Sequence, residues 1–203
     1  YSCKKNKKII LIVNDLGYSV VEKFATMFPK QFYNAGVAEQ NMMGLASGMA
    51  LGGNHVFVYS IGNFPTFRCA EQIRNDVDYH KLPVTIVNVG AGVSYGNLGY
   101  SHHSIQDYAL VRLFPNMLIA APGDQKEIKA CMQYIIKNPQ PSYLRLAKSK
   151  NLILHKKTPN LRPGKWLSIV KKKKDSKKTF LTTGNTSYLE KNFLLTKKFN
   201  NYA

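Results

Sequence analysis

The chain of 203 residues carries 29 Lys and Arg against 11 Asp and Glu, a formal net charge of +18. Its composition, 44% apolar and 20% charged, excludes wholesale disorder, a collagen-like chain and a coiled-coil rod. No apolar run approaches the roughly 20 residues of a membrane-spanning helix, and Ile9–Val13 is too short for a signal-peptide core.

Short apolar runs alternate with helical patterns from residue 9 to about residue 146. The expected strands are Ile9–Val13, Phe32–Asn34, Val56–Ser60, Val84–Val89, Met117–Ala120 and Ser142–Leu146. Apolar residues at helical spacing predict one helix over Phe67–Val77 and another over Ile128–Ile136. This alternation predicts an α/β fold, a parallel sheet with helices on both faces. Sites in such sheets lie at the carboxyl ends of strands, which points to loops 14–19, 34–39, 60–67 and 90–104.

A further helix is expected over residues 38–51, after the turn at Gly36 and with Glu39 in its first turn. An acid in a first helical turn can simply complement the helix dipole, and this alternative needs no function. Residues 38–51, however, are apolar on nearly every side, which predicts a buried helix. Small Gly44 and Gly48 let another backbone approach, so this helix is a candidate homodimer contact. Because a carboxylate at the head of a buried helix is costly without a partner, Glu39 is a candidate functional residue.

Two loops carry further candidates. Residues 59–74 place Phe64 and Phe67 at a strand end and Arg68 in the opening turns of a helix. A loop aromatic is more often part of the core than a ligand platform. Residues 90–103 combine four glycines with adjacent His102 and His103, which predicts a loop shaped around a ligand. A structural histidine is the equal alternative, and the usual phosphate-binding glycine motifs are not present.

The cysteines indicate the redox environment. Cys3, Cys69 and Cys131 are odd in number, far apart and without metal-ligand spacing. They favour reduced thiols in a cytoplasmic protein over a disulfide framework or a zinc site.

The C-terminal part of the chain differs in charge. Residues 148–203 hold 15 Lys and Arg and two acids, a net charge of +13, which leaves +5 for residues 1–147. We predict a first domain over 1–147, a basic linker over 148–178 and the start of a truncated second α/β domain over 179–203. The second domain would begin with a strand, Thr179–Thr183, and a helix, Tyr188–Phe199. The run Lys171–Lys174 lacks interleaved aromatics, so a solvated linker is favoured over nucleic-acid binding.

Several strings of the sequence occur in the order of a known family: Ala38–Gln40, Ile61–Thr66, Arg68–Asp76, Ser101–His103 and Ala121–Asp124. Residues 8–150 thereby resemble the pyrimidine-binding domain of transketolases, most of all the C-terminal subunit of the split two-subunit form. Thr179–Phe199 resembles the start of the family's C-terminal domain. Deoxyxylulose-phosphate synthases and pyruvate dehydrogenase beta subunits share the domain, but Glu71–Asp76 favours a transketolase.

The resemblance implies a thiamine diphosphate-dependent transferase that moves a two-carbon ketol unit between sugar or sugar-phosphate substrates. Glu39 matches the glutamate that binds the cofactor's pyrimidine ring, and His102 matches a histidine near the thiazolium; both are the implied catalytic residues. The other implied cofactor contacts are Phe64 or Phe67 as the stacking aromatic, Arg68, and Asp15, which is equally explained as a turn residue. The implied substrate contacts are His102, His103 and Arg145, the last for a phosphate.

Two positions depart from the family pattern. Leu98 stands where an aspartate contacts a substrate hydroxyl, and Gly90 stands where a basic residue contacts a phosphate. The Gly-Asp-Gly motif that holds Mg²⁺ in the family does not occur, so an N-terminal transketolase subunit is expected to supply the Mg²⁺ ligands. The departures favour one alternative, a non-catalytic paralogue that acts as an assembly scaffold. A deoxyxylulose-phosphate-synthase-like component is a further alternative, because such enzymes share the domain.

Overall fold

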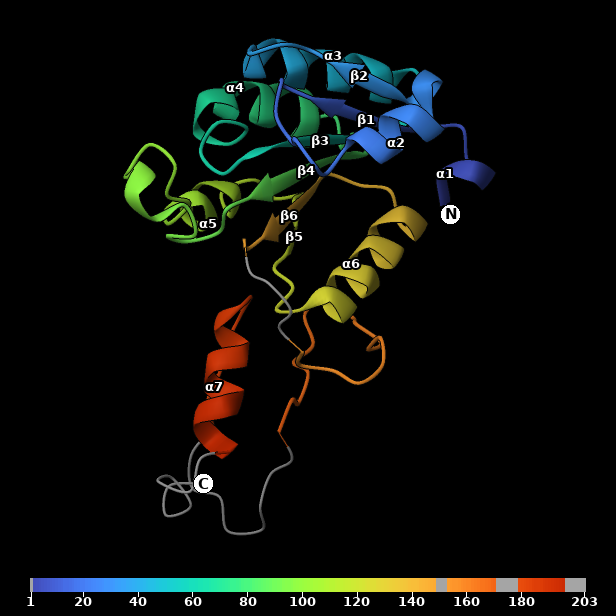
Figure 1. Ribbon diagram of the computed structural model, residues 1–203. Helices are drawn as coiled ribbons and strands as arrows, with labels where there is room; N and C mark the ends of the chain where they lie inside the picture. The colour runs from blue at the N-terminus through green and yellow to red at the C-terminus, as the bar shows by residue number, and fades with distance from the viewer. Residues whose placement is uncertain (1, 149–152, 171–178, 196–203) are drawn as a thin grey trace. The chain divides into compact units, whose positions relative to one another are not determined.

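The structure is a computed structural model that describes residues 2–148, 153–170 and 179–195 (Figure 1). The chain forms two compact units. The first comprises residues 1–120 and 135–148, and the second comprises residues 121–134 and 149–203. The run Lys171–Lys174, predicted to be a solvated linker, lies outside the described residues.

The first unit is built on six parallel strands in the order β2-β1-β3-β4-β6-β5. The strands are β1 Ile9–Val13, β2 Phe32–Asn34, β3 His55–Ile61, β4 Val84–Val89, β5 Leu118–Ala120 and β6 Ser142–Leu146. The predicted parallel sheet is confirmed, and each strand end lies within one residue of its expected place. The chain passes from β1 out to β2 and then back across to β3, so the strand order reverses between β1 and β3. Open parallel sheets bind ligands at the carboxyl edge of such a reversal.

The helices are α1 Ser2–Lys5, α2 Glu22–Met27, α3 Glu39–Leu51, α4 Ala70–Gln72, α5 Asp107–Val111, α6 Gln125–Lys137 and α7 Thr186–Leu195. Short 3-10 turns are η1 Pro29–Gln31, η2 Phe67–Cys69 and η4 Gly96–Leu98, and η3, Ile73–Asp78, is a π-helix. The helix predicted over Phe67–Val77 is therefore three segments with different hydrogen-bond patterns. Asp78, the last residue of the π-helix, is buried, and its Oδ1 accepts the Asn116 N–H at 3.0 Å.

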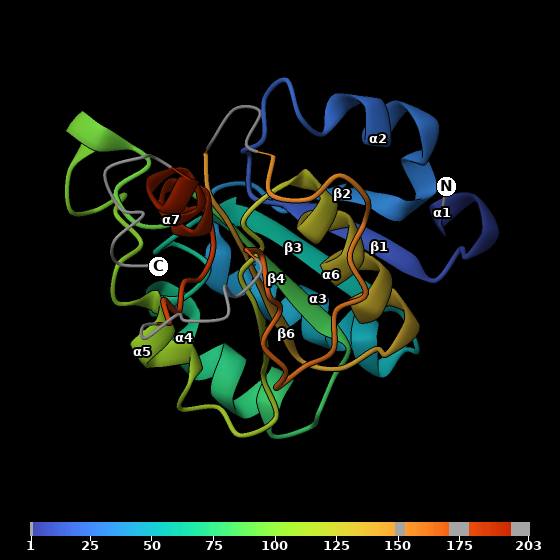
Figure 2. The same cartoon turned by 90° about the horizontal axis from the view of Figure 1, so that it is seen from below.

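Neighbouring strands align their side chains in rows on the sheet face that packs against α3 and η3. Figure 2 shows α3 on the far side of β3 and β4. The first row is Ile10, Val56 and Val84, and the second is Ile12, Val58, Ile86 and Tyr143. Both rows lie in the buried core. The third row, at the carboxyl edge, consists of Ser60, Asn88 and Arg145, and Asn14 extends it one residue beyond β1. We call these four residues the polar row, because here the apolar sheet face becomes polar.

Helix α3 differs from the expectation of burial on every side. Its buried side consists of Glu39, Met42, Met43, Ala46, Ser47 and Ala50. Leu45 and Leu51 are 38% and 67% exposed, and a Cβ built on Gly44 or Gly48 would meet no atom within 4 Å. One sheet face covers only one side of a helix, so among the described residues the opposite side of α3 stays open.

The second unit contains most of α6, the segment 153–170 and α7. Asp124 caps α6, because its Oδ1 accepts the Glu127 N–H at 2.8 Å and its Oδ2 accepts the Leu154 N–H at 2.8 Å. The predicted strand Thr179–Thr183 is absent from the structure, since no described strand pairs with it. The predicted helix is present, starting two residues earlier at Thr186, while residues 196–199 lie outside the described part.

The cysteines are free thiols. Burial raises the pKa of Cys69 to about 12, with the Glu39 charge as a second cause, and burial likewise raises the pKa of Cys131 to about 12. Both groups therefore stay protonated at neutral pH. None of the described helices is long and apolar enough to cross a membrane.

Candidate functional site

Glu39 opens α3 next to the β1–β3 reversal, and only 4% of it is exposed. Its Oε1 accepts a hydrogen bond from Asn14 Nδ2 at 2.9 Å, and its Oε2 accepts one from Arg68 Nη1 at 2.7 Å. Asn14 is 1% exposed, whereas 50% of the Arg68 side chain is exposed. The carboxylate thus has one buried, fixed partner and one partner that solvent reaches.

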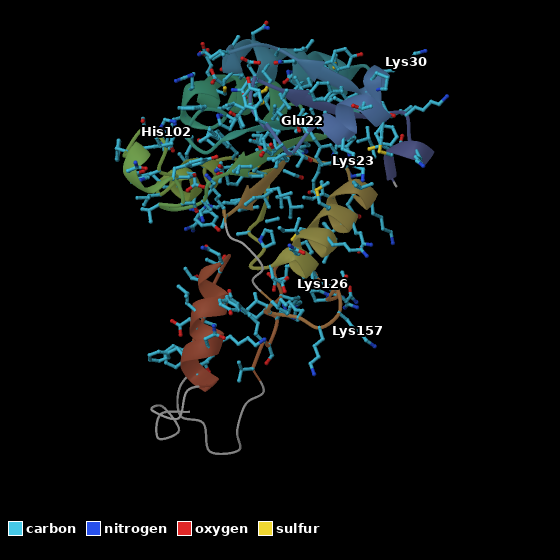
Figure 3. All side chains as sticks on the ribbon, in the orientation of Figure 1. Glu22, Lys23, Lys30, His102, Lys126 and Lys157 are labelled. Carbon is cyan, nitrogen blue, oxygen red and sulfur yellow. The ribbon has the colours of Figure 1, made fainter. Side chains whose placement is uncertain are left out.

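An aromatic and a histidine continue the site from Glu39. The Arg68 guanidinium lies 4.8 Å from the centre of the Phe64 ring. Phe64 meets His102 edge to face with 5.3 Å between ring centres, and the Tyr95 ring also meets that of His102 edge to face, with 5.9 Å between ring centres. Figure 3 labels His102 on its loop. The structure therefore brings four predicted residues, Glu39, Arg68, Phe64 and His102, into one line of contacts.

The loop that carries His102 is closed by its own contacts. Ser104 pairs with Ala91 and Gly92, so the two ends of the loop lie together. His103 Nε2 lies 2.8 Å from the Gly96 carbonyl oxygen, inside the loop. His102 Nδ1 lies 2.9 Å from Ser101 Oγ. The imidazole of His102 is therefore held by Ser101 through one ring nitrogen. The imidazole of His103 contacts the backbone of the same loop.

The structure explains why a glycine occupies position 90. Its φ is +96°, a backbone conformation that favours glycine, and a Cβ at this position would lie 2.1 Å from the Tyr95 ring. The Tyr95 ring thus fills the space that a side chain at position 90 would need, and this is the position where the family resemblance implies a basic residue. Leu98, the other departure, is 52% exposed in η4.

Arg145 is directed at an acidic partner. Its Nε donates to Asp107 Oδ2 at 2.7 Å, and its Nη2 donates to the Ser104 carbonyl oxygen. The Arg145 side chain is 11% exposed and that of Asp107 is 0% exposed. Lys148, three residues further along the chain, is exposed, and its ammonium lies 5.1 Å from the centre of the Tyr95 ring. A phosphate role for Arg145 remains a prediction, and Lys148 is a cation of the same region that the sequence analysis missed.

Two predicted residues stand apart from this line of contacts. Asp15 exchanges hydrogen bonds with Asn34, from its N–H to Asn34 Oδ1 at 2.9 Å and from Asn34 Nδ2 to its Oδ1 at 3.2 Å. Its φ of +57° is typical of a turn-forming Asp. Phe67 is 46% exposed. Within the described ranges, no three acidic, histidine or cysteine side chains are grouped to hold a metal ion.

The residues that hold the site together were not found from the sequence. Asn14 fixes Glu39, Asp107 pairs with Arg145, and Asn63 contacts the His102 loop. A signal existed for Asn14, because it continues the alternation Ile10, Ile12 on the core face of β1. A polar residue at a core position of a strand needs a polar partner.

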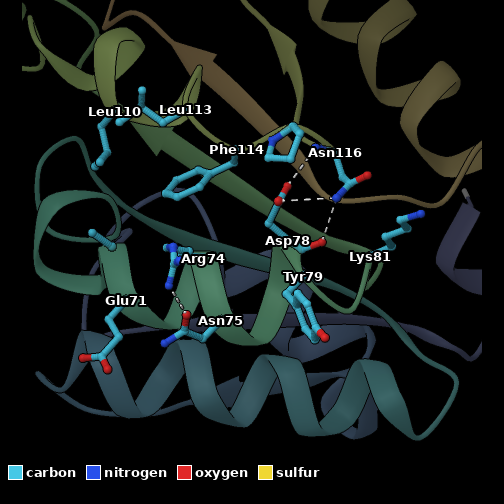
Figure 4. A pocket seen from close by; sticks show the side chains of 12 residues that line it. Glu71, Arg74, Asn75, Asp78, Tyr79, Lys81, Leu110, Leu113, Phe114 and Asn116 are labelled. Carbon is cyan, nitrogen blue, oxygen red and sulfur yellow. Dashed lines mark hydrogen bonds between the residues drawn. The ribbon is translucent and has the colours of Figure 1, made fainter.

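A pocket lies elsewhere in the first unit, between α4–η3 and segment 110–116 (Figure 4). Leu110, Leu113, Phe114 and Tyr79 give it apolar walls, and Arg74, Glu71 and Lys81 add charge. At its floor Asn116 donates to Asp78. None of Glu39, Phe64 and His102 lines this pocket, so it is separate from the candidate site.

Comparisons with known proteins identify the family to which the domain belongs. Residues 2–152 match the family model of the transketolase pyrimidine-binding domain. A protein of Methanocaldococcus jannaschii assigned as a transketolase C-terminal section is 40% identical over 153 residues, which are 75% of this chain and 48% of that protein. One of the subunits of the apulose-4-phosphate transketolase of Phocaeicola vulgatus is 35% identical over 147 residues, 72% of this chain and 47% of that one.

A solved structure described as a split gene transketolase, an inactive beta4 tetramer, matches with a TM-score of 0.70 and 34% identity. That match covers 80% of this chain and 52% of the other. The chain spans about half the length of the curated relatives it matches. Since the family model covers most of the chain, the chain belongs to the transketolase family through its pyrimidine-binding domain.

Proposed function

We propose that this chain is the C-terminal subunit of a thiamine diphosphate-dependent transketolase. Together with an N-terminal subunit, it would move a two-carbon ketol unit between sugar or sugar-phosphate substrates. The observation that carries the proposal is the buried Glu39 carboxylate, held by Asn14 and Arg68. Phe64 lies beside Arg68, and His102 lies beside Phe64. The names of the relatives, a C-terminal section in one case and a single subunit of a transketolase in the other, support an enzyme made of two chains.

The side chains of the site fit the pyrimidine half of the cofactor. Thiamine diphosphate, when bound, supplies an acidic thiazolium carbon and an electron sink. Glu39 would bind a pyrimidine nitrogen through Oε2 and share a proton with it, while Asn14 keeps Oε1 in place. Phe64 would offer a ring face for stacking once Arg68, whose side chain is half exposed, moves from it. Asp15 is proposed as an outer cofactor contact, and Phe67 is the alternative to Phe64 as the stacking residue.

The substrate is proposed to lie beside His102 and His103. A carbonyl or hydroxyl oxygen of a sugar would hydrogen-bond the His102 ring nitrogen that does not face Ser101. Lys148 is an exposed cation near Tyr95 and suits an anionic substrate group. Arg145 would reach a phosphate only by giving up part of its contact with Asp107.

Two protein partners complete the proposal. The N-terminal subunit would supply the Mg²⁺ ligands for the diphosphate, as the family resemblance implies. A second copy of this chain would cover the open side of α3, where Leu45 and Leu51 flank Gly44 and Gly48. An exposed apolar helix side supports self-association, as does the description of the solved relative as a beta4 tetramer.

Calorimetry of thiamine diphosphate binding tests whether the cofactor site is divided between this chain and the N-terminal subunit. We expect the isolated chain to show no binding with a Kd below about 1 μM, because only the pyrimidine half of the site is present. The chain combined with the N-terminal subunit and Mg²⁺ should bind the cofactor well below that value. Binding below 1 μM by the isolated chain would contradict the split site. A complex that forms but does not bind the cofactor would support the scaffold alternative, which the departures at Leu98 and Gly90 favour.

The stacking aromatic is tested by a pair of substitutions. We expect Phe64→Ala to weaken cofactor binding to the complex by about 1–3 kcal/mol, the range of a lost stacking platform. Phe67→Ala is the matched control, because Phe67 is three residues away and 46% exposed. Its effect should stay below about 0.5 kcal/mol. The assignment of Phe64 is wrong if the two variants exchange these effects in the same calorimetric titration.

A further inference from the structure

One side chain outside the predicted site holds the loop that carries His102. Asn63 follows the end of β3, and its Nδ2 donates to the backbone carbonyl oxygens of His103 at 2.7 Å, Tyr100 at 3.2 Å and Ser101 at 3.3 Å. These carbonyls lie before and after His102 in the chain. One amide group thus contacts the backbone on both sides of the candidate catalytic residue.

The chemistry of Asn63 suits this contact. Its Oδ1 is buried and accepts no hydrogen bond from the described residues, so the side chain acts through its NH₂ group. The two amide protons are shared among three carbonyl oxygens. With the amide reversed, its oxygen would face those three oxygens, so the orientation follows from the surroundings.

The turn that presents Asn63 is held by several hydrogen bonds. The Phe64 N–H donates to the Ile61 carbonyl at 2.9 Å, and Thr66 Oγ1 donates to the Gly62 carbonyl at 2.9 Å. Thr66 is 0% exposed. Because Phe64 follows Asn63 directly, the same turn places the Phe64 ring beside the His102 ring, with 5.3 Å between ring centres.

We propose that Asn63 is a positioning residue, which sets the place of His102 relative to Phe64. Its consequence for catalysis rests on the proposed function. Asn63 touches the loop backbone, and it acts on the reaction only through His102. Without its donors, the backbone at residues 100–103 loses three hydrogen bonds and the imidazole is free to shift. A shift of about 1 Å in a reacting group can cost about 100-fold in rate.

Asn63→Asp is the sharpest variant, because it keeps the size of the side chain and replaces the donors with oxygens that face three carbonyls. Asn97→Asp is the matched control, since it adds the same charge at an exposed position of the same loop. The chain has five histidines, so labelled-histidine NMR of the full chain at constant pH gives one set of ring signals for each. His102→Gln identifies the signals of His102.

We expect Asn63→Asp and Asn63→Ala to shift or broaden the ring signals of His102 and His103 by more than the line width. The signals of His55, His80 and His155, which lie outside the loop, should stay in place and show that the fold is intact. Asn97→Asp should leave the His102 signals unchanged. Unchanged His102 signals in both Asn63 variants would overturn the proposal. Loss of all native histidine signals in both variants would also overturn it, because the role would then be general folding.

Turnover of the assembled complex tests the consequence of Asn63 for catalysis. We expect Asn63→Asp to lower turnover by about 10- to 100-fold, with cofactor affinity changed by less than about threefold. Unchanged turnover together with shifted His102 signals would overturn the positioning role. The NMR experiment needs neither cofactor nor partner. If the wild-type complex is inactive but the His102 signals shift in the Asn63 variants, the proposed function is contradicted. The contact between Asn63 and the His102 loop would still be supported.

Discussion

Glu39→Gln is expected to slow removal of the thiazolium proton by about 10²–10⁴-fold in the complex with the N-terminal subunit, Mg²⁺ and thiamine diphosphate. The glutamine keeps the size of the side chain and an oxygen for the 2.9 Å bond from Asn14. It cannot take up or release the proton that the carboxylate shares with the pyrimidine ring. Cofactor affinity should change little, because the contacts of the ring remain. The measurement is the exchange of the thiazolium proton with deuterated water, followed by NMR after an acid quench.

Glu71→Gln is the matched control, since Glu71 is an exposed acid in the first turn of α4. It should leave the exchange rate unchanged. Exchange at the wild-type rate in Glu39→Gln would mean that Glu39 is only a helix-start acid that complements the dipole of α3. Failure of this variant to assemble would instead make Glu39 a structural residue at a buried subunit contact.

The sheet could be predicted because its signals are local. Apolar runs such as Ile9–Val13 and Val84–Val89 are buried on both faces, which only a covered parallel sheet provides. Phe67–Val77 was predicted as one helix and is three segments, since apolar spacing does not report which carbonyl each N–H reaches. The π turn of η3 accompanies a contact between Asp78 and Asn116, which are 38 residues apart. Such a contact has no local signature.

The candidate site also has one part that could be predicted from the sequence and one part that could not. Glu39, Phe64 and His102 were named from motifs, and the structure places them in one line of contacts. The residues that hold them, Asn14 and Asn63, act across 25 to 40 positions of sequence and were missed. Strand alternation carried part of that information, because each member of the polar row lies in or directly continues the core-facing alternation of its strand. A search for polar residues at those core-facing positions would have identified the polar row, which includes Asn14.

Arg145→Met is expected to destabilise the chain by about 3–5 kcal/mol, because it leaves a buried carboxylate without its cation. Asp107 Oδ2 accepts from Arg145 Nε at 2.7 Å and from the Tyr143 hydroxyl at 2.6 Å. Burial raises the pKa of Tyr143 well above its usual value, and the charge of Asp107 adds to the shift, so this hydroxyl keeps its proton and donates. Asn88 Nδ2 adds a longer bond to Asp107 at 3.3 Å. The neutral donors that remain do not replace a cation in a site with 0% exposure.

Urea unfolding at neutral pH measures this loss as a lower transition midpoint. Arg112→Met is the matched control, because Arg112 is exposed directly after α5, and its effect should stay within about 0.5 kcal/mol. Adding Asp107→Asn to Arg145→Met should recover part of the stability, since the uncompensated charge is then removed. If Arg145→Met is as stable as Arg112→Met, the ion pair contributes little to the fold. Arg145 would then be free to turn toward a substrate phosphate, as the family resemblance implies.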